Sequence, residues 1–279
     1  MRLKHNYNKK ITLYKDMRRY DFSYEVLKEL AFFEKNIRDQ IKEEVKTFFI
    51  KNWEDFGDDF IDHSLFDSTW VLIVRDDQGI AGVATVHKKK LKDKIFYNFK
   101  TLALVPKYHS LGLMERMNQL LFKYAYIDNL LREKSLWFHM IFSTPNLRIL
   151  GFFAKHTKRF YPNPFDYDES TQSIPLPDDE TWEYVQAYNQ VDFPPNSPLT
   201  KEGCVLDDSK SAWPHVCYEK SGYPYHTSKI VNAFGDHYLR YKMGERHMVV
   251  VCAHISVGDV VRYFLNYVKR KVQKALVKQ

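Results

Sequence analysis

The sequence predicts an α/β fold with a mixed sheet, and three observations lead to this prediction. Two apolar runs at 69–75 and 80–87 flank a short polar turn, which is the pattern of a β-hairpin. A third run at 95–105 is long enough for a central strand, and Pro106 ends it because proline cannot donate a ladder hydrogen bond. An amphipathic helix is then expected over 112–134, where apolar residues recur at helical spacing.

The remaining elements follow in chain order. Helical spacing of apolar residues predicts a helix over 23–50, whereas 52–68 is acidic and reads as irregular. Residues 135–143 have the composition of a strand, and a helix is expected to begin at Pro145 and Asn146. From residue 69 to residue 155 the sequence therefore predicts three strands, a helix, a strand and a helix.

The last third of the chain is less regular. Residues 161–245 hold many prolines among aromatic residues, so we interpret this segment as a loop-rich insertion that packs against the rest. A strand is expected at 246–255, and its apolar residues on both faces favour an interior place beside 136–143. An amphipathic helix is expected over 257–277. We predict one domain over 1–279, with a core at 69–155.

Composition limits the compartment and the partners. The formal net charge of +7 favours an anionic ligand, but coenzyme A, nucleic acid and acidic lipid all satisfy it. The three cysteines have no metal-binding spacing and no disulfide framework, which suits a reducing compartment. The chain shows no signal peptide and no apolar run long enough to span a membrane. We therefore expect a cytoplasmic protein with no metal site.

The junction between the third strand and the long helix has the chemistry of an anion site. A pyrophosphate must be met by unpaired backbone N–H groups, and the first turn of a helix supplies them with a favourable dipole. A residue without a Cβ lets the anion approach closely, and Gly112 lies where the helix should begin. The alternative is a plain helix start with a turn glycine.

This junction resembles the pyrophosphate-binding junction of the GNAT superfamily of N-acyltransferases, and the resemblance covers about 69–155. The family pattern is Arg/Gln-x-x-Gly-x-Gly/Ala after a β-strand. Gly112 matches its first glycine, whereas His109 and Met114 depart from the Arg/Gln and the final Gly/Ala. The resemblance implies a GNAT-like fold and an acyl-coenzyme A site. The implied binding residues are Leu104, Val105, His109, Ser110, Leu111, Gly112, Leu113, Met114 and Asn146.

The resemblance also implies direct attack of an amine on a thioester. A backbone N–H near Leu104 or Val105 would polarise the thioester carbonyl. The third strand has no carboxylate to act as base, so His139 is the candidate, with His254 as an alternative of equal standing. The usual tyrosine acid is replaced by phenylalanine, and Tyr161 is the candidate substitute. Each also has a structural reading: Asn146 as a helix cap, and His139 and Tyr161 as packed side chains.

Three functions remain open at this stage. The first is an N-acyltransferase that moves an acyl group, most simply acetyl, from acyl-coenzyme A to an amine. The second is a long-chain N-acyltransferase of the same fold that takes its acyl group from an acyl-carrier protein, which the basic run 88–94 would suit. The third is a catalytically inactive binding protein. Nucleic-acid binding rests on charge alone and is ranked last. The acceptor lobe, about 161–245, carries no motif that identifies the amine.

Overall fold

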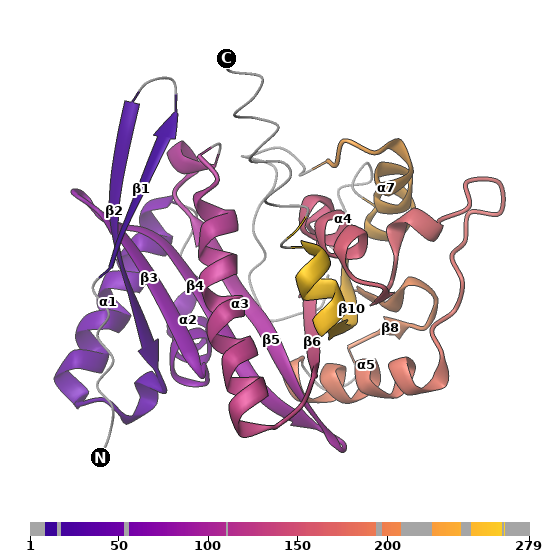
Figure 1. Cartoon of the computed structure of the whole chain (residues 1–279), viewed down its shortest axis with the longest axis horizontal. Helices are drawn as coiled ribbons and strands as arrows, with labels where there is room; N and C mark the ends of the chain where they lie inside the picture. The colour runs from indigo at the N-terminus through magenta and orange to yellow at the C-terminus, as the bar shows by residue number, and fades with distance from the viewer. Residues whose placement is uncertain are drawn as a thin grey trace. The chain divides into compact units, whose positions relative to one another are not determined.

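The computed structural model describes residues 9–15, 18–52, 56–109, 111–193, 197–207, 225–240, 247–263 and 265 (Figure 1). The chain divides into two compact units. Unit 1 consists of residues 1–89 and 97–132, and unit 2 consists of residues 90–96 and 133–279. The tip of one β-hairpin thus belongs to unit 2, while the body of that hairpin belongs to unit 1. The prediction of one domain stays a prediction.

Unit 1 is a sheet in the order β1-β2-β3-β4-β5 with helices on both faces. Its strands are β1 (Lys9–Lys15), β2 (Arg18–Lys28), β3 (Trp70–Asp76), β4 (Gly79–Leu91) and β5 (Lys94–Leu104). Its helices are η1 (Leu30–Phe32), α1 (Lys35–Asn52), α2 (Gly57–Phe66), η2 (Pro106–Tyr108) and α3 (Leu113–Arg132). The predicted hairpin of β3 and β4 is confirmed, with Leu72 opposite Ala84.

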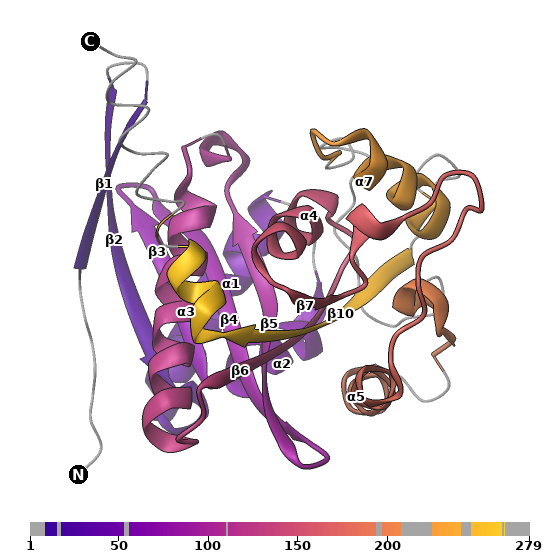
Figure 2. The same ribbon diagram turned by 45° about the vertical axis from the view of Figure 1, so that its right-hand side comes forward.

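Buried apolar side chains point to both faces of the unit 1 strands, which explains why helices cover both faces of this sheet. Val71 and Ile73 pack in one cluster with apolar residues of α1 and α2. Leu72 points to the opposite face, because side chains alternate along a strand, and it too is fully buried. Figures 1 and 2 show α3 on the face opposite α1 and α2. The buried stripe of α3 repeats every fourth residue, at Leu113, Met117, Leu121 and Ala125.

Gly82 on β4 lets α3 approach the sheet closely. A Cβ built on Gly82 would lie 2.9 Å from Met117 Sδ and 3.1 Å from the Ala103 carbonyl oxygen. Any larger residue would therefore push against a side chain of α3 and the backbone of β5. Since Met117 lies one turn after the start of α3, this contact sets how the first turn of α3 lies on the sheet.

Unit 2 contains a smaller sheet in the order β6-β10-β9-β8, and β7 also pairs with β10. Its strands are β6 (Trp137–Thr144), β7 (Arg159–Tyr161), β8 (Leu199–Thr200), β9 (Val205–Asp207) and β10 (His247–Ser256). Its helices are α4 (Leu147–His156), η3 (Pro164–Asp166), α5 (Asp179–Asp192), η4 (Glu202–Cys204), α7 (Lys229–Phe234) and η5 (Gly235–Leu239).

The late strand β10 lies beside β6 in an interior position of the sheet, as predicted. It pairs antiparallel with β6, with His254 opposite His139, and on its other edge with β7 and β9. Helices α4 and α5 cover opposite faces of these strands (Figure 2). Phe142 of β6 contacts Phe153 of α4, whereas Ile141, on the other face, packs in one cluster with residues of α5.

Two predictions in the first quarter of the chain are wrong. The predicted helix over 23–50 begins too early, because β2 runs to Lys28 and α1 begins only at Lys35. Pairing with β1 and β3 keeps this stretch extended although its apolar spacing is also helical. The segment expected to be irregular at 52–68 contains α2, whose Ile61 and Leu65 are buried against α1.

The segment before β10 carries elements that the sequence did not indicate. Chief among them is α5, which begins at an N-cap, Asp178, whose carboxylate accepts the Thr181 N–H at 2.7 Å. The predicted terminal helix is described only in its first part, where residues 257–263 are helical. Residue 246 and residues 266–279 lie outside the described residues.

We expect Gly82→Ala to lower the free energy of unfolding by about 1–3 kcal/mol, because its Cβ would overpack the contact with α3. Urea denaturation measures the loss. In a Met117→Ala background the same substitution should cost less, since the flexible partner is gone. An equal cost in both backgrounds would show that Met117 is not what the new Cβ meets.

Candidate functional site

The junction between β5 and α3 contains most of the predicted binding residues, and all of those described lie in unit 1. β5 ends at Leu104, and the Val105 N–H donates to the Ala81 carbonyl at 2.9 Å. The short helix η2 then turns the chain, with the Tyr108 N–H donating to the Val105 carbonyl at 3.0 Å. α3 begins at Leu113. The chain thus passes from strand to helix in eight residues, of which Ser110 lies outside the described residues.

Gly112 is placed as an anion site requires. Its φ of +76° is a left-handed conformation that side chains with a Cβ rarely adopt. Among the residues that the structure describes, none lies within 4 Å of a Cβ built there, so the space in front of Gly112 is open with respect to them. The N–H groups of Leu113, Met114 and Glu115 follow in the first turn of α3, where a helix offers them no internal partner. The N–H groups of the first turn of α3 therefore lie next to the open space at Gly112.

The side chain of His109 is hydrogen-bonded to the backbone of the junction. Its Nε2 lies 3.1 Å from the Leu104 carbonyl oxygen, and because a carbonyl only accepts, Nε2 must carry the hydrogen. In the neutral ring Nδ1 is then an acceptor and offers nothing to a phosphate. Only the protonated ring could donate to a phosphate through Nδ1. His109 is thus a weaker substitute for the family's arginine than its position suggests.

Tyr108 fastens the junction to the turn between β3 and β4. Its hydroxyl donates to Asp76 Oδ2 at 2.6 Å, and its ring meets Phe22 edge-on at 5.0 Å. Lys107 adds an ion pair to Asp76 at 3.3 Å. Burial of Asp76 alone would raise the pKa of this carboxyl, but the hydroxyl and the other donors outweigh burial and lower it. Asp76 therefore stays ionised and holds Tyr108 in place.

The predicted thioester-polarising group is one of two backbone amides. The Val105 N–H is occupied by Ala81, so it is not available to a ligand in this structure. Since amides of neighbouring residues point to opposite edges of a strand, the Leu104 N–H points to the other edge of β5. Of the two predicted residues, Leu104 is the better candidate.

Asn146 acts as the N-cap of α4 in unit 2. Its Oδ1 accepts the N–H groups of Arg148 at 3.0 Å and Ile149 at 3.3 Å. This is the capping reading that the sequence allowed. The cap occupies the side-chain oxygen, so a ligand could be met only by the amide nitrogen. Its predicted role in coenzyme A binding stays a prediction.

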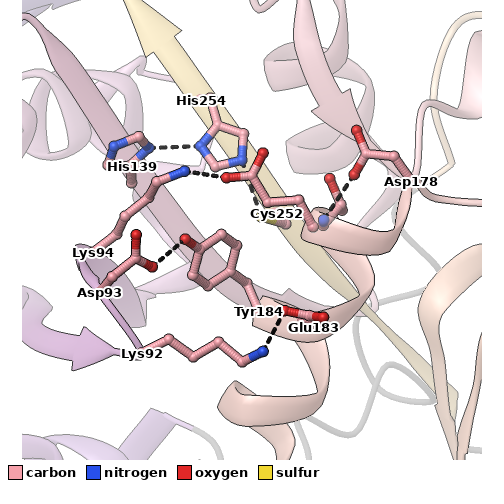
Figure 3. A network of polar contacts seen from close by, with 11 residues as sticks. Lys92, Asp93, Lys94, His139, Asp178, Glu183, Tyr184, Cys252 and His254 are labelled. Carbon is pink, nitrogen blue, oxygen red and sulfur yellow. Dashed lines mark hydrogen bonds and ion pairs between the residues drawn. The ribbon is translucent and has the colours of Figure 1, made fainter.

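Unit 2 brings together the two histidines that the sequence offered as alternatives. His139 of β6 and His254 of β10 are cross-strand partners, and their Nδ1 atoms lie 2.6 Å apart (Figure 3). The ring of Phe96 packs against both, with centroid distances of 5.5 Å and 6.0 Å. We call these two residues the histidine pair.

Burial keeps the histidine pair neutral. It lowers the pKa of His139 to about 4, with His254 and Lys94 as further causes. It also lowers the pKa of His254 to about 4, with Lys94 as the next cause. Near neutral pH both rings are therefore uncharged, as a proton acceptor must be. A pKa this low also makes a single ring a weak base.

Tyr161 lies on the same face of the unit 2 sheet as the histidine pair. It is opposite Cys252 in the register of β7 and β10, two residues from His254. Its hydroxyl oxygen accepts the Gly203 N–H at 3.1 Å. Burial raises the pKa of Tyr161, so the phenol keeps its proton and remains a potential donor. The structure thus places Tyr161 in the same unit as His139, but it tests neither role.

Sequence reasoning missed the residues that enclose the histidine pair. Tyr184 of α5 meets Phe96 at a centroid distance of 4.8 Å, and its hydroxyl donates to Asp93 at 2.6 Å. Glu180 of α5 pairs with Lys94. The N-cap Asp178 and the buried spacing of α5 were available as signals, but the surrounding prolines concealed them.

The described residues contain no group of three or more His, Cys, Asp and Glu side chains that could hold a metal ion. In the same residues, no helix combines the length and the apolar character that crossing a membrane requires.

Several solved structures to which this chain is similar are named as acetyltransferases. A GNAT family N-acetyltransferase (YhbS) from Escherichia coli in complex with CoA has a TM-score of 0.28 at 16% identity. The match covers 36% of this chain and spans 56% of that one. A GNAT family acetyltransferase from Elizabethkingia anophelis with acetyl-CoA bound has a TM-score of 0.33 at 10% identity, covering 84% of this chain and 98% of that one.

The ribosomal-protein-S18-alanine N-acetyltransferase from Escherichia coli has a TM-score of 0.37 at 8% identity, with 84% and 95% covered. No protein-family model matches the sequence, and no curated protein matches it. The first two structures carry the name of the family that the sequence resembles.

We expect Tyr108→Phe to lower the free energy of unfolding by about 2 kcal/mol at pH 7, because it removes a hydrogen bond to a charged group and keeps the ring. The lowered pKa of Asp76 sets the pH dependence. Its contribution is present above the unfolded-state pKa of about 3.9 and is lost as pH falls through the folded-state value. The difference between wild type and variant should therefore shrink below about pH 4.

Denaturation in urea at a series of pH values measures this effect, with Tyr14→Phe as the control, since Tyr14 is 72% exposed. A loss for Tyr108→Phe that is no larger than the control's would show that the bond to Asp76 does not hold the junction.

Proposed function

We propose that this protein is an N-acyltransferase of the GNAT type, which transfers an acyl group, most simply acetyl, from acyl-coenzyme A to an amine. The observation that carries the proposal is the junction of β5 and α3. There a left-handed glycine, open space and the first turn of a 20-residue helix coincide directly after a strand.

The chemistry of the ligand follows from the chemistry of the junction. A diphosphate carries charge that backbone N–H groups and the positive end of a helix dipole can stabilise without a metal ion. The N–H groups of Leu113 and Met114 are the proposed donors, and Gly112 leaves room for the phosphate oxygens. Glu115 in the same turn is a like charge, so the backbone donors must supply most of the attraction.

The proposed reaction uses the remaining predicted residues. Within unit 2, His139 accepts a proton from the attacking amine, and Tyr161 gives a proton to the departing thiolate. In support, His139 is neutral near pH 7 because burial lowers its pKa. Tyr161 holds its proton because burial raises its pKa.

Gly112→Glu tests the proposal against a closely matched control. The added carboxylate would lie in the anion site and repel a diphosphate, so we expect the affinity for acetyl-coenzyme A to fall more than about tenfold. Gly57 also begins a helix in unit 1 and has a φ of +72°, and no residue of the described part of the chain lies within 4 Å of a Cβ built there. Gly57→Glu therefore carries the same backbone strain and the same charge to a different helix.

Calorimetric titration with acetyl-coenzyme A measures both variants. The proposal expects Gly57→Glu to bind like wild type and Gly112→Glu to lose binding while its thermal unfolding matches that of the control. If both variants bind equally well, the junction is not the diphosphate site.

A further inference from the structure

The histidine pair has a geometry that two independent side chains would not need. A separation of 2.6 Å between two Nδ1 atoms requires one hydrogen between them, donated by one ring and accepted by the other. Two protonated rings would place two N–H groups against each other at this distance. The pair therefore holds a single proton at its centre, and its two rings change state together.

The tautomers of the neutral pair are linked. The ring that carries the central proton has a bare Nε2, and the other ring has an Nε2–H. His254 Nε2 faces Cys252 Sγ at 3.8 Å, and the Cys252 side chain is buried. The Cys252 S–H can donate to a bare His254 Nε2, or the sulfur can accept from a His254 Nε2–H. In the second of these tautomers His254 Nδ1 accepts, and the central proton belongs to His139. The bare Nε2, which is the basic atom, is then on His139.

The charged groups around the pair come from four elements and act on the pKa of His254 in both directions. Glu180 and Asp178 raise the pKa of His254, although burial and the cations Lys94 and Arg159 lower it by more. Cys252 stays a thiol, because burial raises its pKa. Among the described residues, the titratable and charged groups that face the pair are Asp93 and Lys94 of the hairpin tip, Asp178, Glu180 and Tyr184 of the α5 region, Arg159 of β7 and Cys252 of β10.

We propose that His139 and His254 act as one proton-accepting unit in the acyl transfer, with His139 as the catalytic residue and His254 as the positioning and relay partner. This inference rests on the proposed function and adds a residue and a coupling to it. His139 meets the amine at Nε2, and the pair shares the charge that either buried ring alone would hold poorly.

The proton balance is as follows. The amine gives a proton to His139 Nε2 as its nitrogen bonds to the thioester carbon, and the central proton moves from His139 Nδ1 to His254 Nδ1. His139 is neutral again, and His254 is an imidazolium ion near Glu180 and Asp178. The carbon–sulfur bond breaks, and the thiolate takes a proton from Tyr161. Solvent then removes the extra proton from the pair and restores the phenol.

The hairpin tip and α5 hold the pair in this arrangement (Figure 3). Lys92 pairs with Glu183, Lys94 with Glu180, and Asp93 accepts the Tyr184 hydroxyl, so the tip is joined to α5 at three points. The rings of Phe96 and Tyr184 also limit the access of water to His254. A water-poor site strengthens the central hydrogen bond, because the effective dielectric constant is low.

Nitrogen NMR of the histidine rings tests the coupling in the free protein. The proposal expects His139 and His254 to titrate as one unit that takes up one proton, below the ordinary histidine pKa of about 6.5. In His254→Gln, which keeps a polar group but cannot relay a proton, the titration of His139 should move. Two rings that titrate independently, with His139 unaffected by His254→Gln, would overturn the coupling.

Turnover tests the catalytic role. Thiol release from acetyl-coenzyme A is followed with spermidine and with a peptide that has a free α-amine. His139→Gln should lower turnover by about 100-fold, within the usual range for general base catalysis, and His254→Gln by about tenfold or more. Because the two act as a unit, the double variant should be no slower than His139→Gln. His237→Gln, an exposed histidine of unit 2, should leave turnover unchanged.

The outcomes separate this inference from the proposed function. If wild type does not bind acetyl-coenzyme A by calorimetry, the proposed function fails. If it binds but shows no turnover with either amine, or if the two single losses multiply in the double variant, the catalytic role of the pair fails while the binding site stands. Unchanged turnover and pH profile in His254→Gln would also overturn it.

Discussion

The passage from β5 into α3 is the constraint on which the rest of unit 1 depends. The chain leaves a buried strand and starts a helix within a few residues, and it does so through a backbone conformation that favours glycine at position 112. Tyr108 fastens this passage to Asp76, and Gly82 lets α3 settle on the sheet. These contacts fix the position of the first turn of α3, so that its N–H groups face open space. The proposed affinity for a diphosphate follows from the direction of these N–H groups.

A different constraint acts in unit 2, where a strand from the end of the chain completes the sheet. Pairing of β10 with β6 places His254 opposite His139, and the side chains of directly opposed residues share one face. Register therefore creates the histidine pair. A slip of one residue would send His254 to the opposite face, which is the face of α4, and the pair would be lost.

The sequence was informative where one pattern dominated. The helix α3 was predictable because its apolar residues recur at helical spacing, and the hairpin of β3 and β4 and the strand β10 were predictable because each strand is a short apolar run. β2 was not, because Leu27 and Leu30 suit a helix while the buried Phe22, Tyr24 and Val26 alternate as in a strand. His139 and His254 could each be listed as candidates, but their 115-residue separation hid the contact, which depends on register. The bonds of His109 and of the Val105 amide also arise only from the folded turn.

The central claim is that the first turn of α3 binds the diphosphate of coenzyme A, and amide chemical shifts report this most directly. Coenzyme A is titrated into the full-length chain while the backbone N–H signals are followed. The account predicts that Gly112, Leu113 and Met114 show large, saturable shifts and that Asp58 and Asp59, in the first turn of α2, do not. Equal shifts at both helix starts, or saturable binding that leaves the α3 signals in place, would contradict it.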